Sequence, residues 1–261
     1  MNQFPVILGV LRYEFRMQMR RPAVWITMIL LSCLFLSLFS RTPNFIENIT
    51  STVTQHSMLY ALAFWTILVN RLHPIGVGVL QADRLPRDRR THVDELLTSL
   101  SGSLSSRLIG KYLGCMLATL VPMFAFYCIG IGYLVYQTGN LMAIPLGLET
   151  FAVVTLPGIL FVSAFSLACP ALLWAPLYQF CFVGYWFWGN WLSPHNGIPT
   201  LSETILTPSG VFMAKGFYGL DEGNYIATPL QGVESMLLLI SIAIFVLFVL
   251  WTFLKWQQSR I

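Results

Sequence analysis

Long apolar runs fill most of the chain, and only one substantial polar stretch interrupts them. Six runs approach the ~20 residues that a helix needs to cross a ~30 Å hydrocarbon layer. They cover roughly residues 22–40, 57–81, 112–136, 150–168, 171–191 and 233–254. Because backbone polar groups in lipid must be satisfied within their own segment, these runs predict helices. The pattern is typical of an all-α integral membrane protein with six transmembrane helices.

Composition agrees with a membrane protein that has no separate soluble domain. The mean hydropathy is +0.69 and 10% of the residues are charged, against about 25% in soluble proteins. We expect a single transmembrane domain over residues 1–261. Its parts are an interfacial helix at 1–21, helices 1 and 2 at 22–81, a cytoplasmic loop at 82–111, helices 3 to 5 at 112–191, an outer segment at 192–232, and helix 6 with a cytoplasmic tail at 233–261.

Basic residues near the ends of the runs predict the orientation, because they are retained on the cytoplasmic side. Twelve of them fall on one side: Arg12, Arg16, Arg20, Arg21, Arg84, Arg87, Arg89, Arg90, Arg107, Lys111, Lys255 and Arg260. Arg41 and Lys215 fall on the other side. We therefore expect a multi-pass protein of the plasma (inner) membrane with both termini in the cytoplasm.

The N-terminal segment has an amphipathic pattern. Basic side chains recur every four residues beside an apolar stripe, which is typical of a helix lying in the membrane interface. We assign Arg12, Glu14, Arg16 and Arg20 to this interfacial helix. The alternative is a solvated start to a long first span.

The stretch from Asp83 to Lys111 holds ten of the 26 charged residues (15 Lys and Arg plus 11 Asp and Glu). Its charges alternate in sign, which favours a protein partner over an anionic lipid surface. The residues that we expect to contact such a partner are Arg87, Asp88, Arg89, Arg90, Asp94, Glu95, Leu96 and Leu97. A solvated loop without a partner is the alternative.

Two other places carry candidate functional residues. Arg71, with His73 beside it, lies inside the second run, where a cation is costly. It either faces a polar cavity that holds an anionic or amphipathic cargo or reaches interfacial lipid phosphate. The outer segment combines prolines with an apolar cluster that includes Phe212, Phe217 and Tyr218, which predicts a partly inserted, broken helical cap.

Catalytic chemistry has little support in the sequence. The six runs contain no Asp or Glu apart from Glu234 at the edge of the last, and neither HExxH nor GxSxG is present. A phosphate-binding loop would need Gly at Ser105 and Ser or Thr at Tyr112. We therefore expect no enzyme activity, no metal site and no cofactor on this chain. Gly110 and Gly114 form a GxxxG pattern that hints at close helix packing.

The chain resembles the permease subunits of type-2 ABC exporters. The likeness is sharpest in LRYEFRMQMRRPAVW, in ADRLPRDRRTHVDELLTSLSGSLSSRLIGKYLG and in the Pro-rich outer segment. It implies six helices, with an elbow helix at the N-terminus, a coupling helix near Arg87 to Leu97 and a re-entrant extracellular gate before helix 6.

The resemblance also implies partners and an activity. The coupling helix would dock on a separate ABC ATPase that binds ATP and Mg²⁺, and a second permease chain, identical or related, would complete the complex. Membrane lipid is an expected partner, and nucleic acid is not. The implied function is export of a hydrophobic or amphipathic cargo such as a lipid, a peptide or a drug. The alternative is an ATPase-independent secondary carrier or a structural membrane subunit, although a carrier should show coupling-ion carboxylates within its spans.

Overall fold

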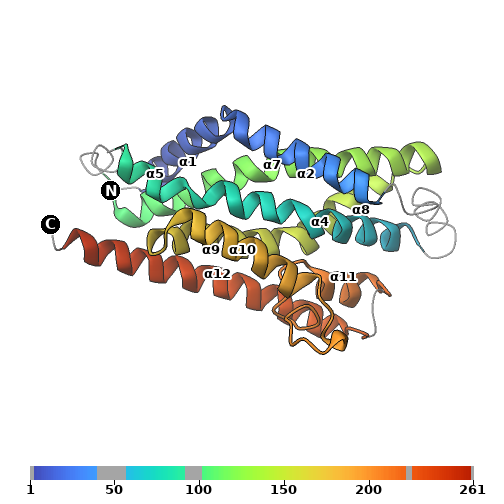
Figure 1. The fold of residues 1–261 in the computed structure, drawn as a ribbon. Coiled ribbons are helices and arrows are strands. Elements are labelled where there is room, and N and C mark those ends of the chain that lie inside the picture. Colours follow the sequence, from blue (N-terminus) through green and yellow to red (C-terminus); the bar gives the residue numbers. More distant parts are fainter. Residues whose placement is uncertain (1–2, 40–56, 92–101, 222–224, 260–261) are drawn as a thin grey trace.

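The chain folds into an elongated bundle of helices (Figure 1). The computed structural model describes residues 3–39, 57–91, 102–221 and 225–259, and these contain helices and no strand. The helices are α1 (Phe4–Met19), α2 (Pro22–Phe39), α4 (Met58–Ala82), α5 (Arg84–Arg90), α7 (Leu104–Thr138), α8 (Ala143–Thr150), α9 (Leu156–Ala168), α10 (Ala175–Asn190), α11 (Val211–Tyr218) and α12 (Pro229–Gln258). A π-helical turn, Phe151–Thr155, joins α8 to α9, and short 3₁₀ turns lie at Cys169–Ala171 and Pro194–Asn196.

Several of these helices are suited to a membrane. Four stretches are long and apolar enough to cross one: Met58–Arg90, Leu104–Thr138, Ala143–Ala171 and Pro229–Gln258. The pair α1 and α2, bent by 62°, would make a fifth. The 16 residues of α10 span about 24 Å, which is less than the ~30 Å of a typical hydrocarbon layer. The expectation of an all-helical, multi-pass membrane protein is therefore met, with four to five clear spans in the described residues.

Both ends of the chain lie at one end of the bundle. The first turn of α1, the whole of α5 and the last turns of α12 lie together there, and α8 and α11 lie at the other end (Figure 1). Figure 1 also shows α4 running through the middle of the bundle. Consistent with that position, α4 packs against α2, α7, α8, α9, α10 and α11.

Helix α7 begins eight residues before the predicted third span. Leu104 starts the helix because the Ser103 hydroxyl caps it, accepting a hydrogen bond from the Ser106 backbone N–H at 3.2 Å. Residues 104–111 at the end of the charged stretch, including Lys111, are therefore helical rather than loop. At its start, α5 follows α4 closely, because only Asp83 separates the two helices.

Helix α1 packs closely on the first turns of α7. A Cβ at Gly110 would lie 2.7 Å from the Ile7 carbonyl oxygen, and one at Gly114 would lie 2.8 Å from the Leu11 carbonyl oxygen. Both contacts are to backbone, so only glycine allows them. The predicted close packing at the GxxxG pattern is confirmed, and the partner helix is α1.

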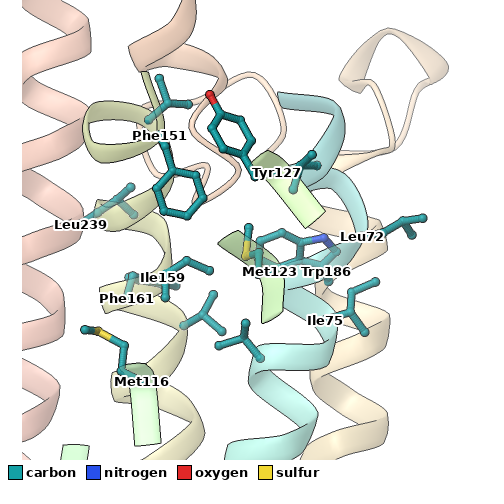
Figure 2. Packing of buried hydrophobic residues seen from close by; sticks show 14 of the residues in the cluster. Leu72, Ile75, Met116, Met123, Tyr127, Phe151, Ile159, Phe161, Trp186 and Leu239 are labelled. Carbon is teal, nitrogen blue, oxygen red and sulfur yellow. The ribbon is translucent and has the colours of Figure 1, made fainter. Parts of the chain in front are cut away.

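Buried aromatic side chains fill the space between α4, α7 and α10. Trp186 is fully buried in the hydrophobic cluster that also contains Leu72 and Met123 (Figure 2). Its indole N–H donates to the Arg71 carbonyl oxygen at 2.9 Å, and the Trp191 indole donates to the same oxygen at 3.2 Å. The accepting carbonyl lies three residues before Pro74, the proline inside α4.

Replacing Gly114 by Ala should separate α1 from α7. The new Cβ would lie 2.7 Å from Glu14 Cβ as well as 2.8 Å from the Leu11 carbonyl oxygen, and such overpacking costs about 1–3 kcal/mol. The matched control is Gly132→Ala on the same helix, where nothing lies within 4 Å and Ala favours the helix by about 1 kcal/mol. Unfolding of the purified variants in detergent should rank Gly132→Ala at or above the parent and Gly114→Ala below it. Equal stability of the two variants would refute the close contact.

Candidate functional site

Four charged side chains from three helices meet at the end of the bundle where α5 lies. They are Glu14 of α1, Arg84 and Asp88 of α5, and Lys111 of α7, and each is at most 5% exposed. Arg84 forms a two-point ion pair with Glu14, at 2.7 Å from Nε to Oε2 and 2.9 Å from Nη2 to Oε1. Its Nη1 lies 2.9 Å from Asp88 Oδ1, and Lys111 Nζ donates to Asp88 Oδ2. We call these four residues the charge network.

The charge network is electrically balanced. Two carboxylates face two cations, and Arg84 binds both carboxylates through different edges of its planar guanidinium. Burial of any one charge alone would cost several kcal/mol, so the network is stable only when all members are present. It therefore fixes the position of α5 relative to both α1 and α7.

Local sequence explains why these side chains converge. Arg84 and Asp88 are four residues apart on α5 and so share one face. The glycine contact at Gly114 brings α1 so near to α7 that Glu14 lies within the junction. Cys115 and Gln18 extend the polar contacts from Glu14 towards the end of α1, with long, weak contacts of 3.8 Å at the sulfur. Arg21 then donates to Gln18 Oε1 at 3.2 Å.

The outer side of α5 is basic. Arg87, Arg89 and Arg90 are exposed, whereas Asp88 is buried. Arg89 Nη2 donates to Gln257 Oε1 at 2.9 Å, which connects α5 to the last turn of α12. Of the residues predicted to dock on a partner, Asp88 is thus bound within the chain. Asp94, Glu95, Leu96 and Leu97 lie outside the described residues.

The predicted interfacial helix is divided between two environments. Arg12, Arg16 and Arg20 form an exposed stripe on α1, as expected, but Glu14 is buried in the charge network. The bend of 62° separates α1 from α2. The location of α1 in a membrane interface remains a prediction.

The structure does not bring Arg71 and His73 into one site. His73 is buried between Ser32 Oγ and the Val69 carbonyl oxygen, each 3.1 Å away, and it stacks on Phe126. Arg71 is half-buried, with its guanidinium carbon 5.9 Å from the centroid of the Trp191 ring. His73 thus faces α2 and α7, whereas Arg71 contacts the end of α10 through Trp191. The predicted contact of Arg71 and His73 with cargo stays a prediction.

The outer segment folds back into the bundle. Asn70 Nδ2 donates to the Ser209 carbonyl oxygen at 2.9 Å, and Thr155 in the π-helical turn donates to Asn70 Oδ1 at 3.0 Å. Asn70 is twelve residues into α4, about 18 Å of helix rise. The left-handed Gly210 (φ +84°) packs against the Val154 carbonyl oxygen, where a Cβ would be only 2.5 Å away.

The three predicted gate residues follow this inserted turn. Phe212 is buried and stacks on Tyr225 at a ring-centroid distance of 5.0 Å, and Phe217 packs near Gly232 of α12. Tyr218 Oη lies 3.4 Å from Glu149 Oε1 of α8. Burial raises the pKa of the Tyr218 hydroxyl, and the adjacent Glu149 charge raises it further. These residues join α11 to the rest of the bundle, and a gating role for them remains a prediction.

The charge network itself was not predicted from the sequence. The sequence pattern places Glu14 on the interfacial helix and Asp88 among the residues that contact a partner. Two features of the sequence point towards the network: the four-residue spacing of Arg84 and Asp88, and the GxxxG pattern at Gly110 and Gly114. The sequence does not show which helix packs against those glycines. Among the described residues, no three His, Cys, Asp or Glu side chains gather as a metal site would require.

Glu14→Gln should destabilise the protein strongly. The variant keeps the side-chain size but leaves the buried network with one excess positive charge, and breaking a buried pair costs about 3–5 kcal/mol. The matched control Arg87→Gln removes an exposed charge from α5 and should change the stability by no more than about 0.5 kcal/mol. Both values come from denaturant unfolding in detergent. Similar stabilities for the two variants would show that the network contributes little.

Comparison with known proteins does not identify a family for the chain. No protein-family model matches it, and no curated protein matches it either. The resemblance to type-2 ABC exporter permeases therefore stays a prediction, and the geometry of α5 and the charge network is the basis for a functional proposal.

Proposed function

We propose that this chain is the membrane subunit of an ATP-driven exporter, whose ATP hydrolysis takes place on a separate ABC ATPase that binds ATP and Mg²⁺. The observation that carries the proposal is the two-sided character of α5. Its outer side offers Arg87, Arg89 and Arg90 to the surroundings, and its inner side is held by buried ion pairs. Such an element is suited to receive a push from a docked protein.

The contacts of α5 would spread such a push over three helices. Arg84 reaches α1 through Glu14, and Asp88 reaches α7 through Lys111. Arg89 reaches α12 through Gln257. Because buried ion pairs keep their geometry better than exposed ones, movement of α5 would shift α1 and α7 with it. A ligand-driven switch needs an element of this kind, one whose contacts differ between two states.

The wider architecture is in keeping with the proposal. The proposal counts α2 and α10 as spans, which makes six, and it assigns α1 as the elbow helix. It also places both chain ends on the cytoplasmic side of a plasma (inner) membrane. Helix α1, which carries the exposed arginines, begins at the end of the bundle where α5 lies (Figure 1). Only 17% of the most apolar part of α12 is buried inside the bundle, which leaves apolar surface for lipid and for a second permease chain.

The proposed cargo is hydrophobic or amphipathic, and the inserted outer segment would act as its extracellular gate. The alternative is a secondary carrier or structural subunit that works without an ATPase. Reconstitution separates the two. Transport of a fluorescent lipid or drug that requires ATP and the ATPase subunit supports export, whereas transport without them supports the alternative.

Reversing charge on the outer side of α5 should uncouple the chain from its ATPase. The double variant Arg87→Glu/Arg90→Glu leaves the charge network intact, so it should fold normally and lose co-purification and transport at least about tenfold. Loss of one charge-assisted contact alone costs about 1.5–3 kcal/mol. The control Gln137→Glu/Asn140→Glu adds acidic charge to exposed residues at the other end of α7. Unchanged assembly and transport in the α5 variant would contradict docking at α5.

A further inference from the structure

A basic groove lies on the outer face of α1. Its volume is about 700 Å³. The residues that line it are Gly9, Arg12, Tyr13, Arg16, Met17 and Arg20. Its three arginines recur every four residues, so they share one face of the helix, and all three are exposed. Within the part of the chain that the structure describes, their guanidinium groups form no ion pair and no hydrogen bond. We call this groove the arginine groove.

The helices that form and support the arginine groove offer it no acidic side chain. Glu14, the one acidic residue of α1, points into the charge network, where it binds Arg84. Helices α2 and α7, which pack against α1, contain neither Asp nor Glu. The outer face of α1 therefore keeps three positive charges, and these favour an anionic ligand.

The arginine groove lies at the level where the apolar part of the bundle begins. On the opposite face of α1, Leu11 contacts Gly114 of α7, and Gln18 lies 3.8 Å from the Cys115 sulfur. The apolar run of α7 starts near residue 112, only a few residues earlier. The 18 residues of α2, which follow α1, contain no charge at all. The arginines therefore lie at the edge of the segments that are suited to hydrocarbon.

This edge is the level of the phosphate groups in a bilayer, because the headgroups flank the ~30 Å hydrocarbon layer. Planar guanidinium groups bind phosphate through paired N–H groups. Tyr13, between the arginines, is 52% exposed, and Leu8, one turn before Arg12, is 52% exposed as well. Exposed apolar side chains beside cationic ones are typical of helices that bind anionic lipids. The groove thus fits a phospholipid better than an acidic protein surface, which offers no acyl chains to Tyr13 and Leu8.

We propose that the arginine groove binds the headgroup phosphate of an anionic phospholipid, with Tyr13 and Leu8 against the upper part of its acyl chains. The lipid belongs to the surrounding membrane. The proposal therefore requires a membrane-embedded chain but not transport, an ATPase or a dimer.

The test is native mass spectrometry of the full chain in mild detergent, titrated with phosphatidylglycerol and separately with zwitterionic phosphatidylcholine. The variant Arg12→Gln/Arg16→Gln/Arg20→Gln removes the phosphate ligands. Its matched control, Arg87→Gln/Arg89→Gln/Arg90→Gln, removes the same charge from exposed residues of α5. We expect the parent and the α5 variant to bind phosphatidylglycerol equally and to prefer it to phosphatidylcholine. The α1 variant should bind it at least tenfold more weakly, which corresponds to about 1.4 kcal/mol.

A second pair of variants tests the groove without removing an arginine. Gly9 lines the groove, and nothing lies within 4 Å of a Cβ built there, so Gly9→Glu and Gly9→Ala should both fold. The new carboxylate of Gly9→Glu would lie three residues from Arg12 and compete with the phosphate. Gly9→Glu should weaken phosphatidylglycerol binding about fivefold, the contribution of one arginine near an anionic headgroup. Gly9→Ala should leave the binding unchanged.

Three results would overturn the proposal. The first is an equal phosphatidylglycerol affinity of the α1 and α5 variants, which would leave only an effect of total charge. The second is an equal affinity of the parent for the two lipids. The third is displacement of phosphatidylglycerol by inorganic phosphate at the same concentration, which would make the groove a site for free phosphate. Size-exclusion chromatography of each variant, run in parallel, separates loss of binding from loss of folding.

Discussion

The buried ion pairs of Arg84 with Glu14 and Asp88 are the constraint on which the rest of this architecture depends. Charged groups are stable in an apolar interior only when each is paired and hydrogen-bonded. That condition is met here because two glycines let α1 approach α7 and because Lys111 completes the balance. The position of α5, and with it the direction of its exposed arginines, follows from this one arrangement.

Along α4, uncharged polar side chains are buried under the same condition, because each is hydrogen-bonded. Its buried polar side chains each bond to a different neighbour: Thr66 to Tyr127, Asn70 to Thr155 and to the inserted outer turn, and Gln81 to Thr119 and Ser163. A hydrophobic contact tolerates sliding, but an unpaired buried polar group costs about 1–3 kcal/mol. The hydrogen bonds of Thr66, Asn70 and Gln81 therefore set the register of the helices that pack around α4.

Sequence reasoning predicted the parts of the fold that depend on hydrophobicity alone. The apolar runs gave the long helices α4, α7 and α12 to within a few residues at most ends, and Gly110 and Gly114 indicated a close helix contact. It placed the start of α7 too late, because the Ser103 cap was read as part of a loop. It did not predict the burial of Asp88 and Glu14. Their burial depends on which helix packs against the glycines, and no local sequence pattern predicts that pairing.

The most direct test of this account is a double-mutant cycle between Glu14 and Lys111, which share the network through Arg84 and Asp88. Glu14→Gln alone leaves an excess positive charge, Lys111→Gln alone leaves an excess negative charge, and the double variant restores balance. If the four residues act as one unit, the free energy of unfolding lost by the double variant should fall short of the sum of the single losses by about 0.5–3 kcal/mol. Additive losses, within about 0.3–0.5 kcal/mol, would mean that the two ion pairs are independent, and α5 would not then join α1 to α7.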